Sequence, residues 1–209
     1  MLTVHHLGIS QSERIVWLCE ELGLDYDLVL HARREDTRGA PDSLKALSPM
    51  GIAPVIVDGG VTLGESGAIC DYIIAKFGGG RLVPAQDSGD WPDHLFWFHF
   101  ANGTFMTNGM MGLAVAVAGA APPPLVTERT ARGWAMAEAR VAEAPFFGGQ
   151  DLTTADIMMG FALTTSRVFT GAPLGDFPAI KAYLQRIGAR PAYQRAMAKA
   201  EPGMVPNLG

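Results

Sequence analysis

Residues 51–67 constrain the fold of this chain more than any other stretch of its sequence. Val55–Val57 is a short β-branched run, the pair Gly59-Gly60 can close a hairpin, and Val61–Leu63 returns as a second strand. Apolar residues then recur at spacings of three and four over residues 68–77, as on one face of a helix. The stretch predicts a strand, a turn, a strand and a helix in immediate succession.

Two features of this stretch could bind a ligand. Pro54 stands where a strand begins, and a cis bond between Ala53 and Pro54 would expose the backbone of Ala53 to a peptide-like ligand. An ordinary trans proline at the start of an edge strand is the alternative. Glu65 and Ser66 begin the predicted helix, where free N–H groups favour a carboxylate, although Ser66 could equally be a helix cap.

The residues before this stretch predict a βαβ unit. Leu2–His6 has the composition of a strand, Ser12–Leu22 that of an amphipathic helix ended by Gly23, and Tyr26–Leu30 that of a second strand. A weak helix is predicted over residues 43–47. The first part of the chain is therefore predicted to be βαβ followed by ββα.

A linker rich in glycine and aspartate follows Gly78, and beyond it the strand pattern disappears. We expect residues 1–80 to form a mixed α/β domain and residues 88–209 an all-α domain. The predicted helices of the second domain cover residues 91–118, 126–144, 153–169, 177–188 and 191–200. The helix over residues 91–118 is expected to bend near Gly109 and Gly112.

The third of these helices carries a strong local signature at its start. Thr153 can cap the helix, Asp156 stands three residues later as in a capping box, and Leu152 and Ile157 can form the hydrophobic staple. A catalytic Asp156 is the competing interpretation. The capping box accounts for this aspartate in full.

Composition and charge exclude several classes of protein. The net charge is −5 with no basic stripe, which argues against binding to nucleic acid or to a membrane surface. The chain shows no signal peptide or membrane span, so a cytoplasmic location is expected. Cys19 and Cys70 face the apolar sides of two helices and are expected to be reduced thiols. The five histidines share no helix or strand face, so no metal site is expected.

Ser10 is the candidate for chemistry. It begins the segment Ser10–Glu13, between the first strand and the first helix, and no cysteine stands there to do dithiol chemistry. The helix end could instead stabilise the thiolate of a ligand, or Ser10 could only cap the helix, and the two roles are compatible. A hydrogen bond to a charged group contributes about 1.5–3 kcal/mol, enough to lower a thiol pKa by about one to two units.

Several short motifs together resemble the cytosolic glutathione S-transferases over nearly the whole chain. They are Ser-x-Ser-x-Arg from Ser10, Glu-Glu-Leu-Gly-Leu from Glu20, Ser-Pro-Met-Gly-Ile-Ala-Pro-Val from Ser48, Leu-Gly-Glu-Ser-Gly-Ala-Ile from Leu63, and Leu-Thr-Thr-Ala-Asp-Ile from Leu152. The resemblance implies a thioredoxin-like domain, an all-α domain that contributes the electrophile site, and glutathione as co-substrate. It also implies a detoxifying transferase and a homodimer. Within the family the chain is most similar to serine-type, theta-like members of bacteria and fungi.

The resemblance assigns roles to individual residues. Ser10 matches the serine that hydrogen-bonds the glutathione sulfur, with Ser12 as the fallback. Ala53 matches the residue before the cis-proline, here Pro54, whose backbone pairs with the cysteinyl part of glutathione. Glu65 and Ser66 match the pair that holds the γ-glutamyl end of glutathione.

Three residues depart from the family pattern. Ile52 stands where many members place Lys or Gln toward the glycyl carboxylate, so Arg33, Arg34 or Arg38 would have to supply that contact. Asn102 stands where similar members of the family often have an acidic residue near the dimer interface. Leu7 leaves no tyrosine at the end of the first strand.

Two functional hypotheses follow from these observations. The first is a transferase in which Ser10 lowers the pKa of the glutathione thiol and the thiolate adds to a small apolar electrophile between the domains. Thiol peroxidase, dehalogenase and isomerase activities use the same site. The second, motivated by Ile52 and Asn102, is a non-catalytic ligand carrier or interaction protein of the same family.

Overall fold

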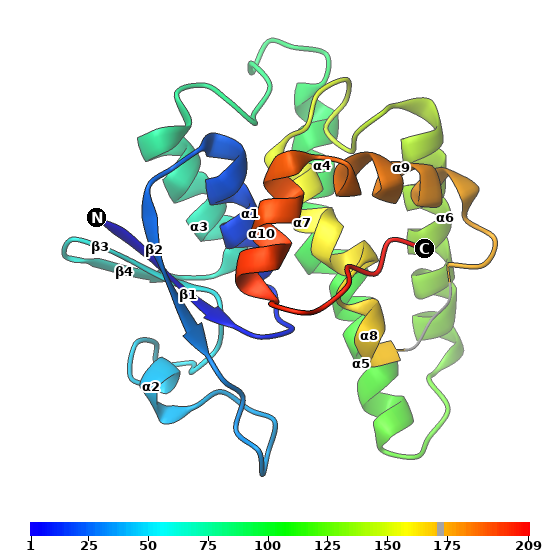
Figure 1. The fold of residues 1–209 in the computed structure, drawn as a ribbon. Helices are drawn as coiled ribbons and strands as arrows, with labels where there is room; N and C mark the ends of the chain where they lie inside the picture. The colour runs from blue at the N-terminus through cyan, green and yellow to red at the C-terminus, as the bar shows by residue number, and fades with distance from the viewer. Residues whose placement is uncertain (171–173) are drawn as a thin grey trace. The chain divides into compact units, whose positions relative to one another are not determined.

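The computed structural model describes residues 1–170 and 174–209. The chain forms two compact units (Figure 1). The first comprises Met1–Leu82 and Ile187–Pro206, and the second Val83–Arg186 and Asn207–Gly209.

A four-stranded sheet of order β2-β1-β3-β4 forms the centre of the first unit. Its strands are β1 (Leu2–Leu7), β2 (Tyr26–His31), β3 (Val55–Asp58) and β4 (Val61–Gly64). β1 and β2 are parallel, whereas β3 is antiparallel to both β1 and β4. The parallel pair requires a crossover, which α1 (Glu13–Leu22) supplies before Gly23 ends it at φ 63°. The predicted βαβ-ββα order is confirmed.

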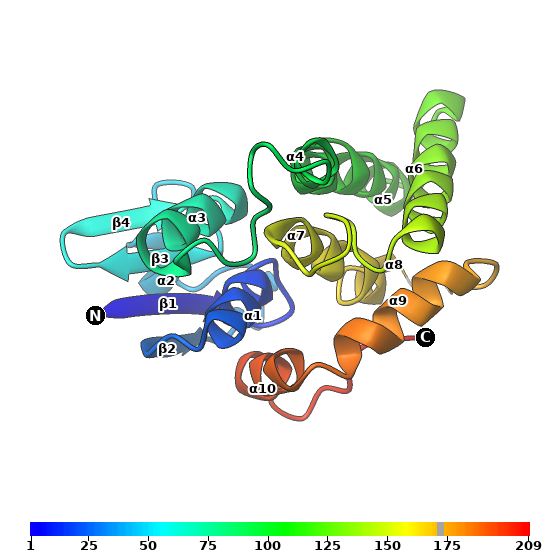
Figure 2. The ribbon, with the colours of Figure 1, turned by 90° about the horizontal axis from the view of Figure 1, so that it is seen from above.

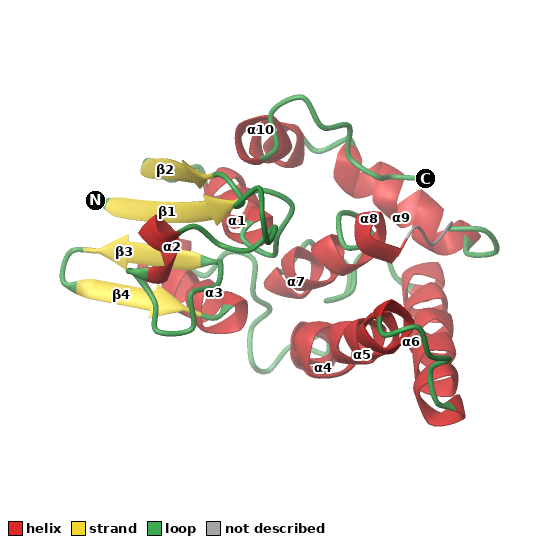
Figure 3. Ribbon diagram, turned by 90° about the horizontal axis from the view of Figure 1, so that it is seen from below, coloured by secondary structure: helices red, strands yellow, loops and turns green. Residues whose placement is uncertain are grey.

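Helices cover both faces of this sheet (Figure 3). α1 and α3 (Ser66–Ile73) lie on one face, and α3 continues as a π-helical turn, η1 (Ile74–Gly78). The short α2 (Asp42–Lys45) lies on the other face, where Leu44 packs with Leu7 and Val55. The sheet thus lies between α1 and α3 on one face and the short α2 on the other.

The last helix, α10 (Pro191–Ala200), packs along α1 (Figure 2). The ring of Tyr193 meets Trp17 edge to face, with 4.9 Å between the ring centroids. Arg190 donates two hydrogen bonds of 2.7 Å to the carboxylate of Glu21. These contacts group Ile187–Pro206 with the sheet.

In the part of the chain that the structure describes, the remaining helical segments belong to the second unit, except that Ile187 and Gly188 at the end of α9 are grouped with the first. α7 packs against α4 and η2, and α6 against α5. The segments are α4 (Trp91–Phe100), η2 (Ala101–Met106, π-helical), α5 (Thr107–Val117), α6 (Pro124–Glu143), α7 (Thr154–Leu163), α8 (Arg167–Thr170) and α9 (Pro178–Gly188).

Two helices of this unit differ from their predictions. The helix predicted to bend near Gly109 and Gly112 is instead irregular at Ala101–Met106, where Asn102-Gly103 has low helix propensity. The helix predicted over residues 153–169 ends at Leu163, because Thr164 leaves helical geometry at φ −116° and ψ −93°. A local hydrophobic pattern does not reveal such interruptions of a helix.

The capping box at the start of α7 is confirmed. Thr153 Oγ1 accepts a hydrogen bond from Ala155 N–H, and Asp156 accepts one of 2.9 Å from Thr153 N–H. Asp156 also accepts hydrogen bonds from Phe147 N–H (2.8 Å) and from the hydroxyl of Tyr183 (3.2 Å). Its carboxylate therefore holds the start of α7 to two other segments.

Across residues 1–170 and 174–209, none of the helices combines the length and the apolar character that crossing a membrane requires.

Candidate functional site

The topology of the first unit places the predicted site residues at one edge of the sheet. β3 runs antiparallel to β1 with Val55 opposite His5, so the residues before β3 lie beside those that follow β1. β4 runs antiparallel to β3 with Gly64 opposite Val55, so the residues after β4 lie at the same edge. The segments around Ser10, residues 52–54 and residues 65–66 therefore belong to one region.

The loop between β1 and α1 is held in a strained conformation. Ile9, which is β-branched, has φ 53°, in the left-handed region that costs such a residue about 1–3 kcal/mol. Arg33 donates to the carbonyls of Gly8 (2.7 Å) and Ile9 (2.8 Å), and the carboxylate of Glu201 accepts from Ile9 N–H (2.5 Å). These bonds fix the backbone immediately before Ser10.

The two candidate serines differ in their surroundings. Ser10 is half-buried, and its Oγ accepts from Ser12 N–H (3.3 Å) and lies 2.6 Å from Ser12 Oγ. Ser12 is fully buried, and its Oγ accepts from Leu7 N–H (3.1 Å) and lies 2.9 Å from Nδ1 of His6. Ser10 is the one that a ligand can reach.

His6 and Glu201 extend this cluster inward. Nε2 of His6 lies 3.1 Å from Oε1 of Glu201, and both side chains are buried. The sequence pattern indicates no role for His6, because the five histidines share no helix or strand face. Glu201 follows α10, 195 positions further along the chain, and no local pattern links the two residues.

The Ala53–Pro54 peptide bond is cis. Pro54 is buried, and Ala53 is half-buried and packs against the cluster of Leu7, Leu44 and Val55. Ile52 is 47% exposed. The backbone of Ala53 is thus held by packing at the edge of the sheet, while Ile52 projects to solvent.

Glu65 and Ser66 form the start of α3. Glu65 is exposed and has φ 68°, and Ser66 is buried at the first position of the helix. Ser66 Oγ lies 3.3 Å from Nη1 of Arg14 and 3.4 Å from Oε1 of Gln11. Gln11 adjoins Ser10, so this cluster links the two candidate segments.

Arg14 adds a positive charge beneath the N-terminus of α3. Its side chain is buried, and burial lowers the pKa of the guanidinium to about 10, which leaves it charged at neutral pH. The helix N-terminus and the buried cation both favour an anionic ligand group. Arg14 was part of the sequence motif, but no role had been assigned to it.

Two of the three arginines suggested as substitutes at the Ile52 position, Arg33 and Arg34, have other partners. Arg33 binds the loop before Ser10 and also the carbonyl of Arg38 (2.8 Å). Arg34 forms a double hydrogen bond with Asp36.

Both cysteines are buried in the first unit. Burial raises the pKa of the Cys70 thiol to about 12 and also raises that of Cys19. Neither thiol is therefore an ionised nucleophile at neutral pH. Within the part of the chain that the structure describes, no three His, Cys, Asp or Glu side chains are grouped as metal ligands.

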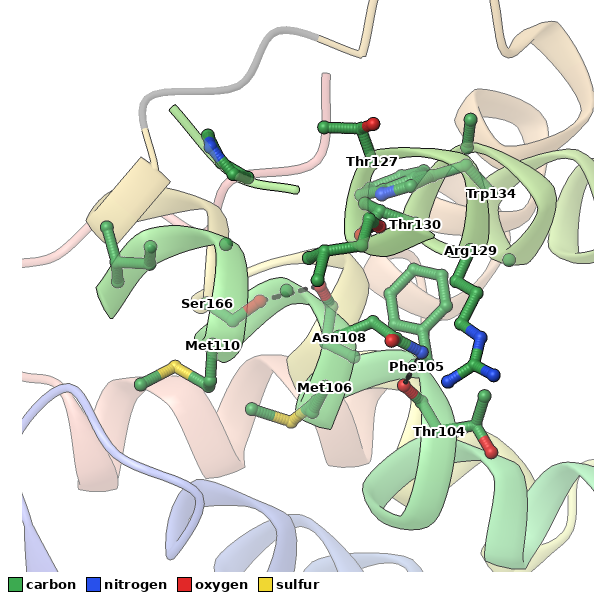
Figure 4. A pocket seen from close by; sticks show the side chains of 18 of the residues that line it. Thr104, Phe105, Met106, Asn108, Met110, Thr127, Arg129, Thr130, Trp134 and Ser166 are labelled. Carbon is green, nitrogen blue, oxygen red and sulfur yellow. Dashed lines mark hydrogen bonds between the residues drawn. The ribbon is translucent and has the colours of Figure 1, made fainter. Parts of the chain in front are cut away.

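The second unit contains an apolar pocket of about 420 Å³ (Figure 4). Asn108, Thr130 and Ser166 each donate a side-chain hydrogen bond to the carbonyl four residues earlier in the chain. The hydroxyl protons of Thr130 and Ser166 and one amide proton of Asn108 are thus engaged, and the wall offers mainly carbon and sulfur. The apolar side chains that line it include Phe100, Phe105, Met106, Met110, Leu113 and Trp134.

A mixed sheet with a cis-proline before β3, joined to an all-helical part, defines a thioredoxin-like domain followed by a helical domain. The family model of the glutathione S-transferase N-terminal domain matches residues 10–76, and that of the C-terminal domain matches residues 125–191. The chain belongs to the glutathione S-transferase family, which uses glutathione as co-substrate.

Individual relatives agree with this assignment. Glutathione S-transferase 3 of Zea mays is 32% identical over 88% of this chain and 87% of its own length. Glutathione S-transferase 3 of Schizosaccharomyces pombe is 26% identical over 96% of this chain and 88% of its own. The crystal structure of a glutathione S-transferase from Actinobacillus pleuropneumoniae matches with a TM-score of 0.85 and 30% identity, covering 100% of this chain and 99% of that one.

Proposed function

We propose that this protein is a glutathione transferase that conjugates the thiolate of glutathione to small apolar electrophiles, with Ser10 stabilising the thiolate. One observation carries the proposal. The half-buried Ser10 lies in the loop before α1, and its neighbour Gln11 contacts both buried Arg14 and Ser66 at the N-terminus of α3, where an anionic group would be favoured. A thiol and a carboxylate of one ligand can be recognised by these two groups.

The other predicted residues have matching roles in this proposal. The backbone of Ala53, set by Pro54, pairs with the cysteinyl unit of glutathione, and Glu65 and Ser66 bind its γ-glutamyl end. Ser12 positions Ser10 rather than contacting the sulfur, because Ser12 is fully buried. Ile52, at 47% exposed, contributes only apolar contact near the glycyl end.

We assign the electrophile to the apolar pocket of the second unit. A Cβ added at Gly109, which lines the pocket, meets no atom within 4 Å, so larger side chains can enter this space. In Gly109→Leu we expect kcat/KM for an apolar electrophile to fall about tenfold or more, with KM for glutathione unchanged. Gly103→Leu is the control, because Gly103 is outside the pocket lining and also has open space. Equal effects of the two variants contradict this assignment.

The remaining expectations from the family resemblance are part of the same proposal. They are a serine-type, theta-like subclass, a cytoplasmic homodimer with a detoxifying role, and thiol peroxidase or dehalogenase side activity. They also include the domain ranges 1–80 and 88–209.

The deciding experiment measures turnover of a chlorodinitroaromatic by the wild type and by Ser10→Ala. Loss of a hydrogen bond to a charged sulfur lowers kcat/KM by about 10- to 100-fold. Ser43→Ala is a matched control, since Ser43 is exposed and its hydroxyl contacts only the ring of His31 among the hydrogen bonds described. Equal activity of wild type and Ser10→Ala removes Ser10 from the mechanism. If millimolar glutathione does not raise the melting temperature, a non-catalytic role replaces the proposal.

A further inference from the structure

Four polar side chains form a continuous hydrogen-bonded chain from the accessible loop into the interior of the first unit. Ser10 Oγ lies 2.6 Å from Ser12 Oγ, Ser12 Oγ lies 2.9 Å from His6 Nδ1, and His6 Nε2 lies 3.1 Å from Glu201 Oε1. Exposure falls to 0% at Ser12 and 1% at His6, and it is 7% at Glu201. Only the Ser10 end is open to a ligand.

Glu201 determines which nitrogen of His6 carries a hydrogen. Its Oε1 accepts from Ile9 N–H and also faces Nε2 of His6. A carboxylate has no proton to donate, so Nε2 of His6 must carry a hydrogen. The charge of His6 then depends only on Nδ1, which faces Ser12.

The hydrogen bonds of these four side chains can be satisfied in two states, in both of which the Ser12 hydroxyl donates to a neighbour in the series rather than to the carbonyl of Leu7, 3.4 Å away. With neutral His6, Ser12 donates to Nδ1 and Ser10 donates to Ser12, which leaves Ser10 Oγ as an acceptor toward the ligand. With charged His6, Nδ1–H donates to Ser12, Ser12 donates to Ser10, and the Ser10 proton points to the ligand. In both states each hydroxyl oxygen accepts two hydrogen bonds, counting the backbone N–H of Leu7 or Ser12.

We propose that Ser10, Ser12, His6 and Glu201 form a proton relay that takes the thiol proton of glutathione and stores it on His6. The inference rests on the proposed function and deepens it. The S–H bond breaks as the proton passes to Ser10 Oγ, Ser10 passes its own proton to Ser12, and Ser12 passes its own to Nδ1. A thiolate and an imidazolium replace two neutral groups, and the net charge of the site does not change.

The relay explains how Ser10 can be a donor to the thiolate. A serine whose proton points at Ser12 offers sulfur only a lone pair, whereas the same serine after the transfer donates its proton to the thiolate. Glu201 stabilises the imidazolium as a buried ion-pair partner. His6, Ser12 and Glu201 thus act through Ser10 as positioning residues.

Other charged groups surround the relay without entering it. Arg33 is bound to the carbonyls of Gly8 and Ile9; burial lowers its pKa, and Glu201 acts in the opposite direction. Burial and the neighbouring His6 lower the pKa of His31 on β2, which lies 3.0 Å from His5. On α1, burial lowers the pKa of Arg14, and Glu13 acts in the opposite direction.

The test counts the protons released when glutathione binds. Calorimetric titrations in buffers of different ionisation enthalpy give that number, and ultraviolet absorbance gives the fraction of thiolate formed. S-methylglutathione is the matched ligand, because a methyl group replaces its thiol proton and the rest of the molecule is the same. At neutral pH we expect the wild type to form the thiolate while releasing no more protons with glutathione than with S-methylglutathione.

Each alternative result has a distinct meaning. One additional proton released for each thiolate formed overturns the relay and leaves the proposed function intact. Absence of any thiolate in the wild type overturns the proposed function and the relay together.

Variants locate the stored proton. In His6→Gln we expect the pKa of the bound thiol to rise by about one unit, which is a tenfold loss of thiolate where the thiol is mostly protonated. Each thiol that still ionises should release its proton to the buffer. His5→Gln is the matched control on the opposite face of the same strand and should behave as wild type. Equal thiol pKa values in the two variants overturn the relay.

A second variant keeps the test decisive if His6→Gln does not fold. Ser12→Ala cuts the relay while leaving the contact between His6 and Glu201, and it should give the same raised thiol pKa. Ser12→Thr restores the hydroxyl and should recover the wild-type pKa. If Ser12→Ala keeps the wild-type thiol pKa and proton count, the relay is excluded.

Discussion

Two buried carboxylates, one in each unit, show how differently the same chemical group can be used. Asp156 of the second unit accepts hydrogen bonds from Thr153 N–H, Phe147 N–H and the Tyr183 hydroxyl. Glu201 of the first unit accepts from Ile9 N–H and lies against the ring of His6. Backbone groups and hydroxyls surround the first carboxylate, whereas a titratable ring contacts the second.

Burial alone does not separate these two residues. Burial raises the pKa of Asp156 to about 6, while its backbone and side-chain hydrogen bonds act in the opposite direction. None of its hydrogen-bond donors in the described structure exchanges a proton near neutral pH, so Asp156 can only hold segments together. Glu201 connects through His6 and Ser12 to the half-buried Ser10. Glu201 therefore differs from Asp156 in two ways: it contacts a titratable side chain, and it is connected to a residue that a ligand can reach.

The largest expected effect is on stability, in Asp156→Ala. The substitution leaves the buried N–H groups of Phe147 and Thr153 without their acceptor, and each unsatisfied group costs about 1–3 kcal/mol. We expect the free energy of unfolding to fall by about 3–5 kcal/mol, as measured by urea denaturation. In the protein that remains folded at low temperature, the thiol pKa of bound glutathione should be unchanged. A loss below about 1 kcal/mol contradicts the scaffold role.

The next effect is on rate, in Glu201→Gln. The amide oxygen can still accept from Ile9 N–H, so we expect unfolding free energy to fall by less than about 1.5 kcal/mol. Loss of the charge beside His6 should raise the thiol pKa by about one unit and lower kcat about tenfold at neutral pH. Steady-state kinetics and ultraviolet titration measure both quantities. If the variant loses stability as Asp156→Ala does and keeps its thiol pKa, the contrast between the two carboxylates is wrong.

The sequence predicted one of these two networks and missed the other, for a physical reason. Thr153 and Asp156 are three positions apart at a helix start, so local spacing determines the capping box. His6 and Glu201 meet only after α10 has packed on α1, and a separation of 195 positions carries no periodic signal.

The same distinction applies to the fold. Hydrophobic spacing predicted the order of strands and helices, because each element buries one face of its own. It predicted α10 as a helix, but an amphipathic pattern does not specify which surface the helix covers. The interruption at Ala101–Met106 was also missed, since the apolar pattern continues through it.

A third buried carboxylate, Glu20 on α1, gives the smallest effect and tests how α10 is held. Burial raises the pKa of Glu20, but hydrogen bonds from Lys199, Arg195 and Tyr26 outweigh burial, so its pKa lies below the ordinary value of 4.5. Folding therefore favours the ionised form. This contribution to stability is present above pH 4.5 and is lost as the pH falls through the lowered pKa.

In Glu20→Gln we expect the free energy of unfolding at neutral pH to fall by about 1 kcal/mol, because both cationic partners are half-exposed. The difference from wild type should shrink toward zero in acid, as urea denaturation at neutral pH and at a pH of about 3 can show. Glu35→Gln, at an exposed position, is the control and should change stability at neither pH. If the thiol pKa of Glu20→Gln also rises, α10 is loosened enough to displace Glu201, and the contacts of Glu20 also support the relay. An unchanged thiol pKa means that Glu20 only stabilises the fold, as Asp156 does.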